Sequence, residues 1–350
     1  MSEARSESPV GALVGIGAAV AVVAAAFAYV AGWLTPERLT PAKIVDSLAP
    51  ASGAAPGYRR NHAKGVCFTG QFEANGNGAR LTTAATLASG VYPVSGRFNL
   101  ATPDPKAQDG LQRVRGLGLR IVTPDRREWR MAMIDAPFFP VSTPQAFYEL
   151  QTALARKGDP DAMKNFIAAH PEFLEFVGWA KTAPFTGSYA EERYNSLDSF
   201  VFDDAAGADH VVRWSFLPVA PPVAVAANEI AGRDPDFLEG EIAQRVQQQP
   251  ARWKMVVTEA LRGDPTADPS KPWPEGRSAV EVGTLSVMAI EAEADGPCRD
   301  LNFDPTVLPP GVHVSDDPFP AARSAAYSVS FNRRSAEDKD YPHAVFGAKP

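Results

Sequence analysis

The sequence predicts an α+β protein built on a closed antiparallel β-barrel with helices packed outside it, preceded by an N-terminal transmembrane helix. Strand-like runs come first, helical spacing follows in the middle of the chain, and strand-like runs return near residue 199. Turns rich in Asn, Gly, Pro and Asp separate the first strand-like runs, and short turns of this kind favour antiparallel pairing. A long apolar segment near the N-terminus adds the transmembrane helix.

That N-terminal segment carries no charged side chain from residue 8 to residue 36, and its central run 11–33 is rich in Ala, Val and Gly. Its length is sufficient for one helix to cross a bilayer. An uncleaved anchor is the preferred interpretation. A cleaved signal peptide, with small residues such as Ala26 and Ala28 before the cleavage site, and a buried soluble helix are the alternatives.

The following elements are predicted from capping residues, periodicity and turn signals. A short helix is expected up to residue 48, because Thr40 is a good N-cap residue and Pro41 suits the first helical turn. A Pro/Gly/Ala linker follows at 49–57. The strand-like runs are 66–73, 91–101, 115–123, 127–134, 199–202, 210–219 and 253–261. The helical runs are 143–156, 159–169, 171–181 and 234–248, and the run 302–317 is expected to be irregular.

Composition and charge narrow the range of functions. The net charge is −7 and the pI is near 5.4, so the chain lacks the basic surface that nucleic acid binding requires. A length of 350 residues allows a core large enough to enclose a cofactor. The cysteines, Cys67 and Cys298, are too few for a disulfide framework or a cysteine-rich metal site, and two buried thiols are expected rather than a disulfide.

The chemistry is expected around residues 59–65, Arg-Arg-Asn-His-Ala-Lys-Gly, just before the apolar run 66–72. An imidazole at His62, between arginines and a lysine, is suited to move protons beside an anionic ligand. On residue type alone, a structural histidine with satisfied hydrogen bonds is the alternative. The remaining histidines show no metal-ligand spacing and are expected to be structural or solvated: His170, His210, His313 and His343.

Four motifs occur in the order in which haem catalases carry them. They are Arg59-x-x-His62-Ala-Lys-Gly, Gly96-Arg97-Phe98-Asn99, Arg113-x-Arg115-Gly116 and Arg323-x-x-x-Tyr327. Over roughly residues 40–350 the chain therefore resembles the haem catalase superfamily, and it is most similar to the small catalase-related peroxidases. The apolar segment and the composition after it predict a transmembrane anchor or signal segment at 8–35 and a linker with a short helix at 36–57. The resemblance implies a catalase-like haem-binding domain at 58–350 without the C-terminal helical region of full-length catalases.

The resemblance also implies a b-type haem with ferric iron and assigns residues to it. Tyr327 matches the tyrosine that ligates the iron, and Arg323, four residues earlier on the same helix face, favours the phenolate form. Arg59, Arg97 and Arg334 match the arginines at the haem carboxylates, which a planar guanidinium binds well.

On the opposite haem face the resemblance places His62, which would move a proton between the two oxygens of a peroxide and promote heterolysis of the O–O bond. Asn99 stands where catalases have a serine that orients the histidine. Ile134 or Met133 replaces a distal asparagine, which should impair hydrogen peroxide dismutation and admit bulkier organic hydroperoxides. Phe147 matches an aromatic residue beside haem, with a core phenylalanine as the alternative.

These features predict a haem peroxidase that reduces hydrogen peroxide or organic hydroperoxides with a small organic electron donor. A true catalase with a remodelled distal side is one alternative. A non-catalytic barrel that binds haem or lipid is another, and the presence of both His62 and Asn99 argues against it. The N-terminal helix is expected to hold the protein in a bacterial-type inner membrane with the catalytic domain in the periplasm.

Overall fold

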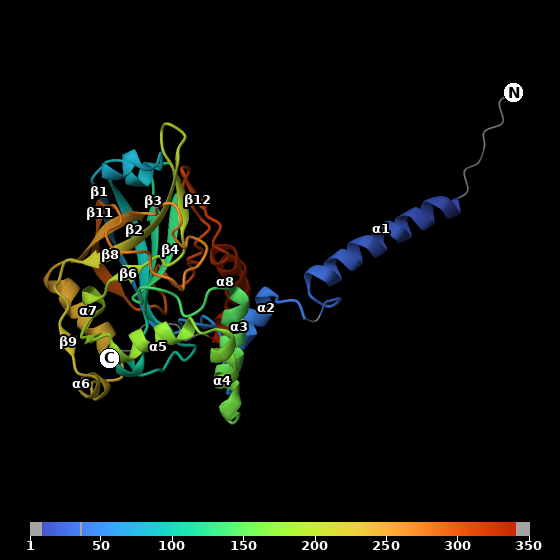
Figure 1. Cartoon of the computed structure of the whole chain (residues 1–350), viewed down its shortest axis with the longest axis horizontal. Coiled ribbons are helices and arrows are strands. Elements are labelled where there is room, and N and C mark those ends of the chain that lie inside the picture. The colour runs from blue at the N-terminus through green and yellow to red at the C-terminus, as the bar shows by residue number, and fades with distance from the viewer. Residues whose placement is uncertain (1–8, 36, 341–350) are drawn as a thin grey trace.

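The structure, a computed structural model, describes residues 9–35 and 37–340 (Figure 1). Its centre is a closed barrel of eight antiparallel strands, with helices packed outside it. This architecture confirms the predicted fold class. The predicted segment boundaries at residues 8, 36 and 350 lie outside the described residues, as does His343.

The barrel closes because β10 pairs with β8 on one side and with β11 on the other. Around the barrel the order is β1, β2, β3, β4, β6, β8, β10 and β11, and β11 returns to β1. The bounds are β1 Gly65–Ala74, β2 Gly90–Leu100, β3 Arg115–Val122, β4 Glu128–Ile134, β6 Tyr194–Asn195, β8 Asp209–Pro218, β10 Ala251–Glu259 and β11 Ala279–Glu291.

Alternate residues of each long strand fill the barrel, as the period of two in a strand requires. In β4, for example, Trp129, Met131 and Met133 are buried in the central hydrophobic cluster, whereas the residues between them are partly exposed on the outer face. The outer face of β2 to β4 is therefore free to line a site.

Short elements extend this sheet or lie beside it. β7 (Phe200–Asp203) pairs with β8, and β12 (Val312–Val314) pairs with β7. A separate two-stranded ribbon joins β5 (Phe185–Thr186) to β9 (Ala224–Val225). The 3-10 helices are η1 Asn77–Arg80, η2 Ala85–Leu87, η3 Asp109–Leu111, η4 Tyr189–Glu191 and η5 Asp338–Asp340.

Helix α1 (Pro9–Val30) extends away from the barrel, and α2 (Pro41–Ser47) follows it (Figure 1). The run Val10–Val30 is long and apolar enough to cross a membrane and is not buried against the protein, although a signal sequence has the same properties. The predicted cap of α2 is confirmed, because the Thr40 hydroxyl accepts a hydrogen bond from the Lys43 amide at 3.3 Å.

The helices α2, α3 and α8 lie together on one side of the barrel (Figure 1). Buried apolar side chains of α3, α4 and α8 form a second hydrophobic cluster, separate from the barrel core. The bounds are α3 Pro144–Ala155, α4 Pro160–Ala169, α5 Phe173–Thr182, α6 Ala227–Ala231, α7 Phe237–Gln248 and α8 Phe319–Ala336.

The sequence did not predict β11, although it is the strand that closes the barrel. Its alternation of apolar residues is interrupted after Val282, where Gly283 follows directly and the pairing with β10 shifts register. Such a bulge inserts one residue and breaks the period of two. The short strand β12 also lies within the run 302–317 that was expected to be irregular.

Candidate active site

A cavity lies against the outer face of the barrel, between strands β2 to β4 and helix α8, with α2 and α3 at its sides. Its empty volume is about 1290 Å³, counting the open mouth. All eight residues that the sequence assigned to a site line this one cavity: Arg59, His62, Arg97, Asn99, Phe147, Arg323, Tyr327 and Arg334. Side chains from the two ends of the chain are therefore brought together here.

Strand register places Asn99, Gly116 and Ile134 in one row, and Asn99 and Ile134 of this row line the cavity. Asn99 pairs with Gly116, and Gly116 pairs with Ile134. A Cβ atom on Gly116 would lie 2.2 Å from Oδ1 of Asn99, so glycine leaves the room that the amide occupies. Because Met133 belongs to the barrel core, Ile134 is the residue that shares the outer face with Asn99. Both residues line the cavity, but only Ile134 stands in the row of Asn99, whereas the Met133 side chain is buried in the barrel core.

His62 and Asn99 form a direct hydrogen bond, with Nδ1 of the imidazole 2.6 Å from Oδ1 of the amide. The amide nitrogen of Asn99 donates to the Arg97 carbonyl at 3.4 Å, so its oxygen is the atom turned to the ring. A carbonyl oxygen only accepts, and the proton must therefore reside on Nδ1. The Nε2 lone pair is left to accept a proton from a ligand.

Burial lowers the pKa of His62 to about 4, against the opposing effect of the bond to Asn99. The positive charges of Arg97, Arg323 and Arg59 lower this pKa further. His62 is therefore a neutral base throughout the neutral pH range.

The backbone at His62 is held in a left-handed conformation, with φ of 56°. A non-glycine residue in this region costs on the order of 1–3 kcal/mol and persists only where its surroundings fix it. Arg97 supplies such fixing contacts, because it donates to the His62 carbonyl at 2.8 Å and to the Ala63 carbonyl at 3.2 Å. The His62 amide donates to Oδ1 of Asn61 at 2.9 Å.

Helix α8 presents Arg323 and Tyr327 one turn apart on the face that lines the cavity. Nη2 of Arg323 donates to the Tyr327 hydroxyl oxygen at 3.1 Å and to the Ala132 carbonyl of β4 at 2.7 Å. Its Nη1 forms an ion pair with the buried Asp198. Burial by itself would lower the pKa of Arg323, but the interactions with the Tyr327 and Asp198 oxygens are stronger, so the pKa is raised. Arg323 is thus a fixed cation beside the phenol oxygen.

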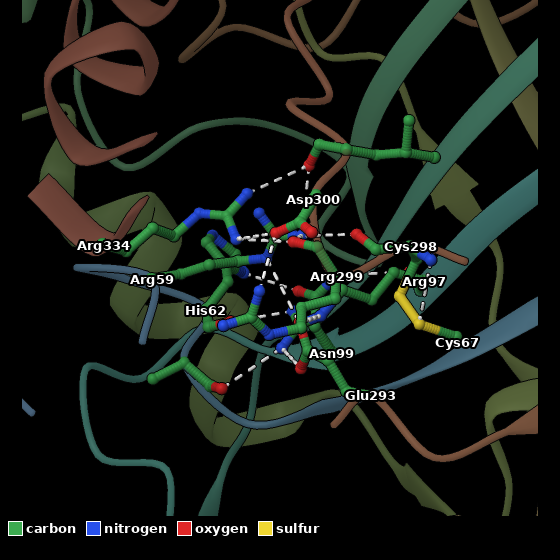
Figure 2. The surroundings of a disulfide bond; sticks show 12 residues. Arg59, His62, Cys67, Arg97, Asn99, Glu293, Cys298, Arg299, Asp300 and Arg334 are labelled. Atoms are coloured by element: carbon green, nitrogen blue, oxygen red, sulfur yellow. Dashed lines mark hydrogen bonds and ion pairs between the residues drawn. A yellow bond between two sulfur atoms is a disulfide. The ribbon is translucent and has the colours of Figure 1, made fainter. Parts of the chain in front are cut away.

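Arg59, Arg97 and Arg334, here called the arginine cluster, lie close together around Glu293 (Figure 2). The Glu293 carboxylate accepts from Arg97 at 2.8 and 2.5 Å and lies 3.6 Å from Nε of Arg59. Burial lowers the pKa of Arg334. Arg334 also lies 3.8 Å from the exposed Asp300 carboxylate. Three guanidinium groups gathered at one end of the cavity suit an anionic ligand.

Backbone carbonyls of residues 293–301, here called the acceptor loop, hold the arginine cluster from outside (Figure 2). Arg59 donates to the carbonyls of Cys298, Arg299 and Leu301 at 2.9, 3.2 and 3.2 Å. Arg334 donates to the Arg299 carbonyl at 2.5 Å. The guanidinium directions are therefore set by backbone atoms of this loop.

Cys67 and Cys298 are joined by a disulfide, so the prediction of two buried thiols was wrong. They are separated by 231 residues in sequence, but their Cα atoms lie 5.3 Å apart, well within the reach of a disulfide. The bond connects β1 to the acceptor loop. The number of cysteines could not reveal this, because pairing depends on the distance that the fold creates.

Phe147 of α3 lines the cavity and also packs against the second hydrophobic cluster, with its ring 5.5 Å from that of Phe139. The two interpretations that the sequence offered for Phe147 are thus compatible. Together with Ile44, Val45 and other apolar residues, it gives the cavity wide apolar walls.

Three polar residues of this region had no assigned role in the sequence analysis. Asp198 pairs with Arg323, Glu293 binds the arginine cluster, and Arg60 forms a 2.6 Å ion pair with Glu337 just beyond α8. Asp198 and Glu293 each pair with an arginine more than a hundred residues away in the sequence. No local sequence pattern could therefore indicate these contacts. Arg60 lies within the motif around His62, and only this position in the sequence indicated that it could belong to the site.

The other histidines in the described part of the chain have carboxylate partners, in agreement with a structural role. His170 bonds Glu149 at 2.7 Å, His210 bonds Glu259 at 2.7 Å, and His313 bonds Asp203 at 2.5 Å. Residues 9–35 and 37–340 contain no group of three His, Cys, Asp or Glu side chains that could hold a metal ion. A metal at the cavity would therefore need a prosthetic group to supply most of its ligands.

Barrel and cavity together define an enzyme of the catalase-type barrel class. The catalase family pattern matches residues 39–340. A catalase-related peroxidase of Synechococcus elongatus is 32% identical over 301 residues, which cover 85% of this chain and 89% of the relative. A second catalase-related peroxidase, from Mycolicibacterium paratuberculosis, is 32% identical over 304 residues, covering 86% of this chain and 96% of the relative. The solved structure of a bacterial catalase matches with a TM-score of 0.71 at 20% identity, over 79% of this chain and 57% of that catalase.

The chain belongs to the catalase family, which confirms the predicted resemblance. Members of this family bind haem, and the cavity fits that group. Its walls are largely apolar, one end carries the three guanidinium groups of the arginine cluster, and a phenol oxygen beside a guanidinium lines it from α8. These features match, in turn, a flat apolar macrocycle, its two carboxylates and its iron.

Proposed function

We propose that the protein is a peroxidase that uses b-type ferric haem to reduce hydrogen peroxide or organic hydroperoxides with a small organic electron donor. The observation that carries this proposal is the shared cavity. Tyr327 with Arg323 reaches it from α8, and His62 with Asn99 reaches it from the barrel side. Similarity to two catalase-related peroxidases supports the same conclusion.

Haem bound in this cavity, with its iron ligated by the Tyr327 oxygen, would supply the redox centre at which the peroxide bond is broken. Arg323 stabilises the negative charge of the phenolate, because its guanidinium lies 3.1 Å from that oxygen. Asp198 and the Ala132 carbonyl hold the guanidinium in place. Arg59 and Arg334, whose directions the acceptor loop sets, would bind the haem carboxylates. Arg97 joins Glu293 to the backbone at His62.

His62 acts as a proton shuttle. Its Nε2 atom accepts the proton of one peroxide oxygen and delivers it to the other, which leaves as water or as an alcohol. Asn99 keeps the second ring proton on Nδ1, and burial keeps the ring neutral before the reaction. Both conditions are needed for Nε2 to accept a proton.

The apolar wall near His62 determines which peroxides react well. Ile134 lies one strand beyond Gly116 in the row that includes Asn99, and its side chain offers no hydrogen bond. Dismutation of hydrogen peroxide requires a second peroxide to be held in a defined position, which an apolar side chain does poorly. The apolar wall favours organic hydroperoxides with a separate electron donor.

The domain is anchored to a bacterial-type inner membrane by α1 and faces the periplasm. Helix α1 has the length and composition of a membrane span. The buried Cys67–Cys298 disulfide supports exposure to an oxidising compartment, where such bonds form and persist. Protease added to intact spheroplasts should digest the domain, and an alkaline wash should leave it in the membrane fraction. Digestion only after lysis would contradict this orientation.

The absorption spectrum of the purified protein, loaded with haem, tests the proposal. The wild type should show tyrosinate-to-iron charge transfer and should oxidise a simple phenol when peroxide is added. Tyr327→Phe should lose the charge-transfer absorption, because the ring no longer carries an oxygen ligand. Tyr148→Phe is the matched control, because Tyr148 lies on α3 outside the cavity lining. A wild-type protein that stays colourless after haem loading would overturn the proposal.

A further inference from the structure

The Cys67–Cys298 disulfide lies where the acceptor loop meets the barrel (Figure 2). Cys67 is the cross-strand neighbour of Arg97 in the pairing of β1 with β2. Cys298 lies within the acceptor loop, and both cysteines are fully buried. The bond thus ties the strand beside one member of the arginine cluster to the loop that holds the other two.

The acceptor loop contacts every member of the arginine cluster. Its carbonyls accept from Arg59 and Arg334, and the Glu293 carboxylate at its start accepts from Arg97. A carbonyl accepts along directions fixed by the backbone. A shift of the loop would therefore turn the guanidinium groups away from the cavity, even if the arginines themselves were unchanged.

The loop is irregular, and its local hydrogen bonds link its own residues. The Gly296 amide donates to the Glu293 carbonyl at 3.2 Å, and the Leu301 amide donates to the Cys298 carbonyl at 3.2 Å. Besides the ion pair between Glu293 and Arg97 of β2, the loop meets the barrel at the disulfide: the Cys298 amide lies 3.2 Å from Sγ of Cys67, and a Cβ atom on Gly296 would lie 2.7 Å from the same sulfur. The loop is therefore packed tightly on the disulfide.

We propose that the Cys67–Cys298 disulfide is a positioning element for haem, which fixes the acceptor loop so that the arginine cluster retains the haem carboxylates. This inference rests on the proposed haem binding. It gives the disulfide a role in the site beyond general stability, and it means that full haem retention depends on the oxidised state of the two cysteines. Cys67 and Cys298 are then positioning residues, which act through Arg59, Arg97 and Arg334.

The test compares haem loss from four forms of the full-length protein to an excess of apomyoglobin, followed by absorbance. These are the wild type, Cys67→Ala/Cys298→Ala, Gly296→Ala and Val212→Ala. Gly296→Ala displaces the loop while both cysteines remain, because the new methyl group would lie 2.4 Å from the Ala292 carbonyl oxygen and 2.7 Å from Sγ of Cys67. Val212→Ala is the control for stability alone, because Val212 is fully buried in the barrel core and does not line the cavity. Urea unfolding of each apoprotein and amide hydrogen exchange of residues 293–301 accompany the measurement.

The double alanine variant and Gly296→Ala should lose haem roughly tenfold faster or more, the effect typical of lost second-layer support at a bound metal group. The amide hydrogens of residues 293–301 should also exchange faster in these two variants. Val212→Ala should unfold at a lower urea concentration but lose haem at the wild-type rate. Haem loss at the wild-type rate from the double alanine variant would overturn the inference, as would equal acceleration in Val212→Ala. If the double variant does not fold, wild-type protein whose disulfide has been reduced by dithiothreitol takes its place, and haem loss at the rate of the oxidised protein overturns the inference. A wild type that binds no haem would instead refute the proposed function.

Discussion

Replacing Asn99 by leucine tests whether the amide sets the reactive state of His62. Leucine is close in size but has no acceptor, so the Nδ1 proton of His62 loses its 2.6 Å hydrogen bond in a buried place. A buried donor without a partner costs about 1–3 kcal/mol. The ring avoids this cost by moving its proton to Nε2 or by rotating, and either change removes the lone pair that we propose takes the peroxide proton.

An energy of this size lowers the reactive population of His62 by about 5- to 150-fold. We expect the same decrease in the second-order rate constant for reaction of the haem-loaded protein with peroxide, measured by stopped flow at neutral pH. Asn99→Ser retains an oxygen acceptor, so its second-order rate constant should be closer to that of the wild type. Asn99→Asp should raise the pKa of His62 above its value of about 4, because a carboxylate stabilises the imidazolium.

The haem content of each variant is measured first, so that a slow reaction is not confused with an empty cavity. Reaction of fully loaded Asn99→Leu at the wild-type rate would show that the amide does not control the imidazole. The reasoning would also be refuted if Asn99→Ser were as slow as Asn99→Leu, since the two differ in the presence of an acceptor.

Two further predictions concern pH and peroxide preference. The His62 pKa of about 4 lies below the ordinary value of 6.5, so the ring stays neutral as the pH falls through 6.5 and is charged only near 4. The rate of the peroxide reaction should therefore hold from neutral pH to about 5 and then decline, and a decline centred near 6.5 in stopped-flow traces would contradict the assignment. Ile134→Asn adds a hydrogen-bonding group to the row that contains Asn99, so it should increase oxygen evolution from hydrogen peroxide and slow the reaction with bulky organic hydroperoxides. An oxygen electrode measures the first effect, and an unchanged preference between the two peroxides would rule out a selective role for Ile134.

Local patterns in the sequence determined most of the regular elements and the helical part of the site. The Thr40-Pro41 start predicted α2, and alternation of apolar residues predicted the strands that present Arg97 and Asn99. The spacing of Arg323 and Tyr327 already required one shared helix face, because four residues make about one turn. These features depend only on neighbours within one element, which is why the sequence alone was sufficient for them.

The tertiary structure decided the contacts between distant segments. Glu293 reaches Arg97 across 196 residues, and Cys298 reaches Cys67 across 231 residues, with no local signal for either contact. That Ile134 and not Met133 stands in the row of Asn99 required the register of β3 with β4, since adjacent residues of a strand point to opposite faces. Side-chain chemistry and spacing along the chain therefore determined which residues could take part in the chemistry. Closure of the barrel determined which of them meet, because pairing of remote strands fixes distances that no local pattern encodes.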